Sequence, residues 1–240
     1  MLTIENTTRE IAEARPTMAV WGIGAIEQHG PALPVSTDWW AISHSSRAVA
    51  ERLGACLVPA LPFSMSECHG PMYGTVWLKP WTLAAVVKDV ARSVRQQGIK
   101  TLIILNGHGG NFVLESTIRE LNLTYDDMRV IMPESWFLID GPANVPIHST
   151  EEIHAGEGET SSQMYINSEN VREERVDFVP PVGREFLDYK TMDYISPYGV
   201  WGLSSFADAE HGRQATERRV DRIVRIIDDR LAQLDELRGE

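Results

Sequence analysis

Apolar positions along the chain form short continuous runs that alternate with longer periodic segments. The runs are rich in β-branched residues and are bounded by Gly or Pro, a pattern typical of strands covered on both faces. The clearest is 100–105, directly before a glycine-rich turn. We predict strands over residues 17–23, 55–59, 100–105 and 128–133.

The segments between these runs repeat apolar residues at three- and four-residue steps, as amphipathic helices do. Glycines at 54 and 98 end two of them. We predict helices over 41–53, 82–97, 111–121 and 213–237. The last has an apolar stripe suited to packing on the sheet or on a neighbouring subunit. Alternating strands and helices predict an α/β protein with a mostly parallel central sheet, whose site lies beyond the carboxyl ends of the strands.

Composition narrows the classes of partner. The 240 residues predict one domain over 1–240, and 22 basic against 34 acidic residues give a net charge of −12. This balance disfavours nucleic acid and anionic membranes, which both require basic surfaces. Two cysteines and an N-terminus without a secretory pattern lead us to expect a cytoplasmic protein acting on a small molecule.

The first candidate site follows the first predicted strand. Glu27 and His29 are two residues apart, and Asp38 comes at the start of the next helix. An extended chain would place the first two side chains on one side, so all three can converge on a cation. Taken singly, each has a structural explanation, such as a helix N-cap for Asp38. Their position together beside a strand end favours a site.

The second candidate is Asn106-Gly107-His108-Gly109-Gly110-Asn111, which ends a strand and opens a helix. Glycines around His108 let the backbone approach a ligand closely. A phosphate-binding turn is the alternative, because helix N-termini bind anions. The spacing matches neither the dinucleotide nor the nucleoside-triphosphate motif, and no Lys follows.

The third candidate lies around His154, Glu157 and Glu159, where glycines separate the charged residues before a helix expected near Thr160. On composition alone, an acidic solvated loop explains this segment. The long loop after the second strand also carries His69, which can reach the same site. Four aromatic residues are candidates to wall the pocket, with filling of the core or of an interface as the alternative role. They are Tyr73, Trp77, Trp81 and Trp201.

These three ordered blocks resemble the creatininase (creatinine amidohydrolase) family. The resemblance implies a creatininase-like three-layer α/β/α fold, a homohexamer and a two-metal hydrolytic centre. It also implies that Glu27, His29, Asp38 and His108 are metal ligands, with Asp38 the bridge. Creatininase places a further ligand glutamate where this chain has Gly110, and we assign the fifth ligand to Glu159 instead.

The resemblance further implies a catalytic role for His154, which matches a family histidine credited with proton transfer to the leaving group. Glu157 is expected to orient this imidazole or to act in its place. Three carboxylates in one cleft would repel one another without cations, and two divalent ions supply +4 against −3. Mixed nitrogen and oxygen ligands suit Zn²⁺, with Mn²⁺ or Fe²⁺ as alternatives.

The sequence therefore predicts a metal-dependent hydrolase that opens a small cyclic amide by attack of metal-bound hydroxide on a carbonyl. Relatives within the resembled family act on formamides, on peptide precursors of cofactors or on keto-inositols by C–C cleavage, and the motifs do not separate these substrates. Two other classes stay open. One is a non-catalytic phosphate or nucleotide binder, and the other is a structural zinc protein with a closed ligand shell.

Overall fold

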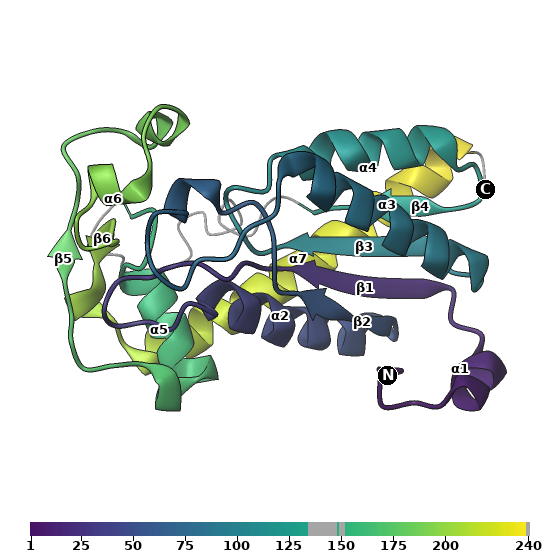
Figure 1. Ribbon diagram of the computed structural model, residues 1–240. Coiled ribbons are helices and arrows are strands. Elements are labelled where there is room, and N and C mark those ends of the chain that lie inside the picture. Colours follow the sequence, from purple (N-terminus) through teal and green to yellow (C-terminus); the bar gives the residue numbers. More distant parts are fainter. Residues whose placement is uncertain (134–147, 149–151, 239–240) are drawn as a thin grey trace.

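A parallel sheet forms the centre of the molecule. The computed structural model describes residues 1–133, 148 and 152–238. Its four-stranded sheet has the order β2-β1-β3-β4, with every neighbouring pair parallel (Figure 1). The predicted parallel sheet is confirmed, with strand bounds β1 Met18–Ile23, β2 Cys56–Leu61, β3 Thr101–Asn106 and β4 Arg129–Ile131.

Helices cover both faces of this sheet, as the α/β/α prediction requires. Alternate residues of each strand point to opposite faces. The covering helices are α2 Thr37–Leu53, α3 Pro80–Gln96, α4 Val113–Thr124 and α7 Ala209–Arg238. Trp21 and Ile104 pack in the core beneath α3 and α4, whereas Val20 and Ile103 pack in the core beneath α2 and α7.

The apolar stripe of α7 belongs to the core of the protein. Val220, Ile223 and Ile227 are buried against residues of β1, β3 and α2. Of the two roles that we considered for this stripe, the structure shows packing on the sheet. The stripe therefore gives no support to an oligomer.

Several elements differ from the predicted bounds. Helix α2 starts at Thr37 rather than 41, because the backbone N–H and the hydroxyl of Thr37 both donate to the Pro34 carbonyl. Helix α5, Glu157–Ile166, starts three residues before Thr160. Helix α1, Thr8–Ala14, was not predicted, and a capping box at Thr7 and Glu10 begins it.

Smaller elements gather beyond the carboxyl ends of the strands, at the left of Figure 1. They include an antiparallel pair of short strands and, with α5, form the end of the molecule where the site lies. Their bounds are β5 Asp177–Phe178, β6 Gly202–Leu203, α6 Met192–Ile195, η1 Glu67–His69, η3 Ser168–Asn170, η4 Arg184–Asp188 and η5 Ser204–Phe206. Among the described residues, no helix is both long and apolar enough to cross a membrane.

The strand order places a topological switch point between β1 and β3. From β1 the chain adds β2 on one side and then crosses to add β3 on the other. The ends of β1 and β3 are level, since Ile23 pairs with Asn106 and the Gly107 N–H donates to the Ile23 carbonyl at 2.8 Å. Open α/β sheets bind ligands at such a point. The segments that follow β1 and β3 carry the first two candidate sites.

Candidate metal centre

The loop after β1 turns its polar side chains into one buried cluster. A hydrogen bond from the Glu27 N–H to the Val35 carbonyl, 2.8 Å, joins the two ends of this loop. Gly30 has φ +65°, a conformation that favours glycine. The loop returns the chain to α2, whose first turn carries Asp38. Asp38 is not the N-cap, since Ser36 occupies that position.

Two sets of potential ligand atoms share Asp38. In the first, His108 Nδ1 lies 3.0 Å from Asp38 Oδ2 and 3.3 Å from Glu27 Oε2. In the second, His29 Nε2 lies 3.3 Å from Asp38 Oδ1 and 3.6 Å from Glu159 Oε2. Within each set, the ligand atoms lie within 4.8 Å of one another. The structure thus brings together all five residues that we predicted as ligands.

Backbone carbonyls orient both imidazoles. His108 Nε2 donates to the Met65 carbonyl at 2.9 Å, and His29 Nδ1 donates to the Glu27 carbonyl at 3.0 Å. A carbonyl can only accept, so each bond assigns a hydrogen to the nitrogen that faces away from the carboxylates, called the outer nitrogen here. The other ring nitrogen, the inner one, faces the carboxylates. Metal-bound histidines in proteins commonly have this arrangement.

Gly110 leaves no room for a ligand side chain of its own. A Cβ at this position would lie 2.4 Å from the Met65 carbonyl oxygen and 2.5 Å from His108 Nε2. Any side chain would therefore break the hydrogen bond that orients His108. In this structure, therefore, the turn at Gly110 has no space for the glutamate implied by the family resemblance, and Glu159 reaches the cluster from α5 instead.

The cluster attracts positive charge. Burial lowers the pKa of His29, but the charges of Glu159 and Asp38 outweigh burial and raise it to about 10. Burial likewise opposes protonation of His108, and Glu27 and Asp38 hold its pKa well above the usual value. Burial raises the pKa of Glu159 to about 7, although 35% of its side chain is exposed. Protons on the imidazoles supply the positive charge between these carboxylates.

The donor set fits divalent cations. Glu27 Oε2 and His29 Nε2 are buried and make no hydrogen bond to any described residue. Their polar neighbours are ion-pair contacts within the cluster, with His108 Nδ1 and Asp38 Oδ1, each at 3.3 Å. Both atoms belong to the two sets described above, and a cation bound there would satisfy them. Carboxylate oxygens and imidazole nitrogens are ligands for Zn²⁺ and Mn²⁺.

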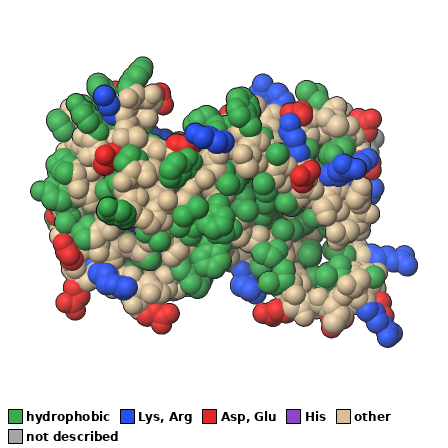
Figure 2. Space-filling view, in the orientation of Figure 1, with side chains coloured by type: hydrophobic (Ala, Val, Ile, Leu, Met, Phe, Trp, Pro, Cys, Tyr) green, Lys and Arg blue, Asp and Glu red, His purple; other side chains and the backbone are tan. Residues whose placement is uncertain are grey.

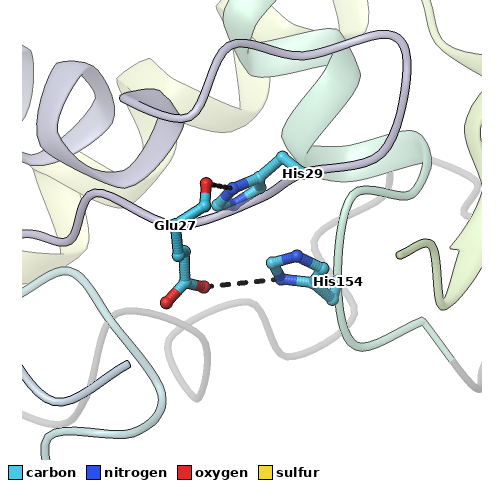
Figure 3. Close-up of side chains that lie close together, drawn as sticks. All are labelled: Glu27, His29 and His154. Atoms are coloured by element: carbon cyan, nitrogen blue, oxygen red, sulfur yellow. Dashed lines mark hydrogen bonds and ion pairs between the residues drawn. The ribbon is translucent and has the colours of Figure 1, made fainter. Parts of the chain in front are cut away.

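His154 approaches the same cluster from the segment before α5 (Figure 3). Its Nδ1 lies 3.7 Å from Glu27 Oε1, and its Nε2 lies 2.7 Å from the Gln28 carbonyl oxygen. Burial and the charges of His29 and His69 lower the pKa of His154 well below its usual value. Backbone bonds to Trp201 hold the segment in place. His154 is thus a buried imidazole whose Nδ1 faces the site.

Glu157 does not join this group. Both of its carboxylate oxygens contact His148 Nδ1, at 3.1 and 3.2 Å, and one accepts a hydrogen bond from the His148 N–H. In the part of the chain that the structure describes, no contact joins Glu157 to His154. Its expected role in orienting His154 stays a prediction.

Two further side chains complete the cluster. His69, on η1, is buried with Nε2 3.5 Å from Glu27 Oε1, in line with the reach that we expected from its loop. Gln28 was missed, because in an extended strand its side chain would point away from those of Glu27 and His29. Residues 27–29 belong to no strand, and the side chains of Glu27, Gln28 and His29 all contact members of the cluster.

The aromatic residues expected around the pocket separate into two groups. Trp201 is buried in the core, whereas Tyr73 and Trp81 are strongly exposed and Trp77 is 40% exposed. Figure 2 shows apolar side chains gathered over the middle of the face drawn there. The contribution of Trp201 that the structure shows is to His154, through backbone hydrogen bonds in both directions.

The fold and the cluster define an α/β protein with a buried carboxylate–imidazole centre at its switch point. The family model described as creatinine amidohydrolase (Creatininase) matches residues 5–227. The chain belongs to the creatininase family, as the sequence blocks predicted.

Curated relatives support this assignment. A creatinine amidohydrolase of Pseudomonas putida is 30% identical over 66% of this chain and 68% of its own length. A mycofactocin precursor peptide peptidase of Mycobacterium ulcerans is 27% identical over 91% of this chain and 87% of its own length. The two names concern different substrates, so the family alone does not fix the substrate here.

Solved creatininase structures share the fold. A Zn–Zn form of a creatininase mutant has a TM-score of 0.81 at 23% identity, covering 95% of this chain and 97% of that one. A manganese form has a TM-score of 0.83 at 22% identity, covering 95% and 98%. The predicted creatininase-like fold is confirmed.

Proposed function

We propose that this protein is a two-metal hydrolase that opens a small cyclic amide at its C–N bond. The observation that carries the proposal is the position of Asp38, whose two oxygens face two separate ligand sets. A carboxylate shared in this way suits a bridge between two ions. A closed structural zinc site would need only one set of four ligands.

Each ion would have its own ligands in addition to Asp38. Glu27 and His108 would hold one ion, and His29 and Glu159 the other. When bound, divalent ions polarise a carbonyl and make water more acidic, which favours hydrolysis near neutral pH. We propose Zn²⁺ first, with Mn²⁺ or Fe²⁺ as alternatives, because the ligand set contains no thiolate.

His154 is proposed to carry the proton. The bond from Nε2 to the Gln28 carbonyl leaves the lone pair of Nδ1 facing the site. A lowered pKa keeps this imidazole neutral, so Nδ1 can take a proton from the attacking water. The same nitrogen then gives that proton to the departing nitrogen as the C–N bond breaks. Glu157 remains the alternative proton carrier.

Most names among the relatives favour a C–N bond over a C–C bond, although one relative is a 3-dehydro-scyllo-inosose hydrolase of Thermotoga maritima, 23% identical over 86% of this chain. Creatinine amidohydrolase and the precursor peptide peptidase are both named for cleavage of amide-type bonds. A formamide is the next candidate, and a keto-inositol cleaved at a C–C bond is the third. Assembly as a homohexamer is proposed from the family alone, and light scattering on the purified protein measures it.

The phosphate-binding alternative receives little support from the turn around His108. The backbone N–H groups of Gly107, His108, Asn111 and Phe112 donate to acceptors within the protein. They are therefore not free to surround a phosphate, as a phosphate-binding turn requires.

A substrate screen tests the proposal. Protein loaded with zinc or manganese is assayed against cyclic amides, N-formyl compounds, short peptides and keto-inositols. We expect turnover of a cyclic amide in wild type, and a loss of about 100- to 10,000-fold in His154→Gln with metal content retained. Turnover of another substrate class alone would refute the cyclic-amide proposal. An unchanged rate in His154→Gln would assign proton transfer to another group.

A further inference from the structure

The side chain of Gln28 is buried between two imidazoles and held at both ends. Its Oε1 accepts a hydrogen bond from the Gly30 N–H at 3.1 Å, and its Nε2 lies 2.9 Å from His69 Nδ1. Gly199 packs so closely that a Cβ there would lie 1.8 Å from Gln28 Oε1. The donor from Gly30 fixes the orientation of the amide, so the nitrogen of Gln28 must face His69.

This orientation determines which nitrogen of His69 carries the hydrogen. The amide nitrogen can only donate, so His69 Nδ1 accepts. A neutral imidazole then carries its hydrogen on Nε2, and that nitrogen lies 3.5 Å from Glu27 Oε1. His69 therefore presents an N–H to the carboxylate.

The other imidazoles of the cluster are arranged in the opposite sense. His29, His108 and His154 each donate from one ring nitrogen to a backbone carbonyl, so the other nitrogen, which faces the carboxylates, can offer a lone pair to a cation once any proton on it is displaced. His154 Nε2 is also 3.1 Å from Gln28 Nε2, but its 2.7 Å contact with the Gln28 carbonyl is shorter and assigns the hydrogen to that bond. Among these four, only His69 has the Gln28 amide donor and no backbone carbonyl at that nitrogen.

We propose that Gln28 is a positioning residue that keeps His69 as an N–H donor to Glu27 and out of the ligand set. An imidazole with its lone pair directed inward, 3.5 Å from Glu27 Oε1, would compete for the cation. With the hydrogen there instead, His69 orients the carboxylate, as partners of ligating carboxylates do. The benefit to metal binding rests on the proposed function, but the hydrogen assignment does not.

The hydrogen assignment is measured by nuclear magnetic resonance of metal-free protein labelled with ¹⁵N-histidine, at pH 8. The signals of His69 are identified by their loss in His69→Gln. We expect Nε2 to carry the hydrogen and Nδ1 to be unprotonated in wild type. A hydrogen on Nδ1 of wild type would overturn the proposal, whether or not any variant folds.

Replacing the amide nitrogen of Gln28, a donor, by a carboxylate oxygen, an acceptor, tests whether Gln28 sets the tautomer of His69. In Gln28→Glu a carboxylate replaces the amide nitrogen, so we expect His69 Nδ1 to gain a hydrogen. Asn122→Asp makes the same exchange in an amide that bonds to Val130, and it should leave the His69 signals unchanged. Unchanged His69 signals in a folded Gln28→Glu would show that Gln28 does not set the tautomer.

Measurements of zinc affinity test whether the His69 N–H orients Glu27 for metal binding. His69→Leu removes the N–H donor and should weaken zinc binding about 10- to 100-fold, the usual cost of losing such a partner. His69→Gln offers an amide N–H at a similar reach and should recover most of the affinity. Equal affinity in wild type and His69→Leu would refute the orienting role. If wild type binds no zinc while His69 shows the expected tautomer, the proposed function fails and the hydrogen assignment stands.

Discussion

Replacing Gly110 by Ala tests how closely the centre depends on the turn after β3. The added Cβ would meet the Met65 carbonyl oxygen at 2.4 Å and His108 Nε2 at 2.5 Å. The carbonyl cannot easily move, because Met65 is buried and its N–H donates to Asn111 at 3.1 Å. Relief of the clash must therefore lengthen the 2.9 Å bond between His108 and Met65.

The expected cost follows from that bond. Leaving a buried carbonyl unpaired costs about 1–3 kcal/mol, and overpacking adds about 1–3 kcal/mol. Lower entropy of the unfolded chain returns about 0.4–1 kcal/mol. We expect the free energy of unfolding of the metal-free protein to fall by about 1–6 kcal/mol. Zinc affinity should fall about 10- to 100-fold, because His108 loses its orienting partner.

Urea unfolding and zinc titration measure these two effects. The same substitution made in His108→Ala is the matched control, since the imidazole is then absent and part of the clash disappears. The cost of Gly110→Ala should be smaller in that background. An equal cost in both backgrounds, or no loss of stability in the first, would refute the reasoning.

Three further predictions concern other parts of the molecule. Ile223→Ala should lower the free energy of unfolding by about 2–5 kcal/mol, because this side chain is buried in the core beneath α7, whereas exposed Arg225→Ala should change it little. If zinc is present at about 1,000 times the dissociation constant of each site, chelation should remove about 4 kcal/mol of stability per ion and lower the Tm by roughly 8–16 °C per ion. An unchanged Tm would contradict a metal centre. Glu157→Gln should retain most turnover, because its carboxylate contacts His148 and not His154; a loss as large as that of His154→Gln would reverse the two roles.

The sheet was predictable because strands that are buried on both faces consist of continuous apolar residues. Such runs can be recognised in the sequence without knowledge of tertiary contacts. The run at residues 100–105 became β3 with a shift of one residue. Helix starts were less predictable, since Thr37 begins α2 through a bond to the Pro34 carbonyl that no periodicity encodes. Helix α1 contains no buried residue and therefore shows no apolar pattern.

The candidate ligands were predictable from chemistry that the sequence displays at strand ends. The structure brings Glu27, Asp38 and His108 together because β1 and β3 end at the same level of the sheet. Gln28 could not be predicted, since its orientation depends on hydrogen bonds with Gly30 and with His69, which comes from a distant segment. The direction of Glu157 likewise depends on His148, which comes from a different segment.

Metal analysis of the purified protein tests the central claim most directly. Wild type, Asp38→Ala and the surface control Asp89→Ala are each reconstituted with zinc or manganese, freed of excess metal and measured by elemental analysis. We predict about two equivalents per chain in wild type and in Asp89→Ala, and a sharp fall in Asp38→Ala because both sites lose a ligand. Wild type that retains no metal, or Asp38→Ala that retains as much as wild type, would contradict the account.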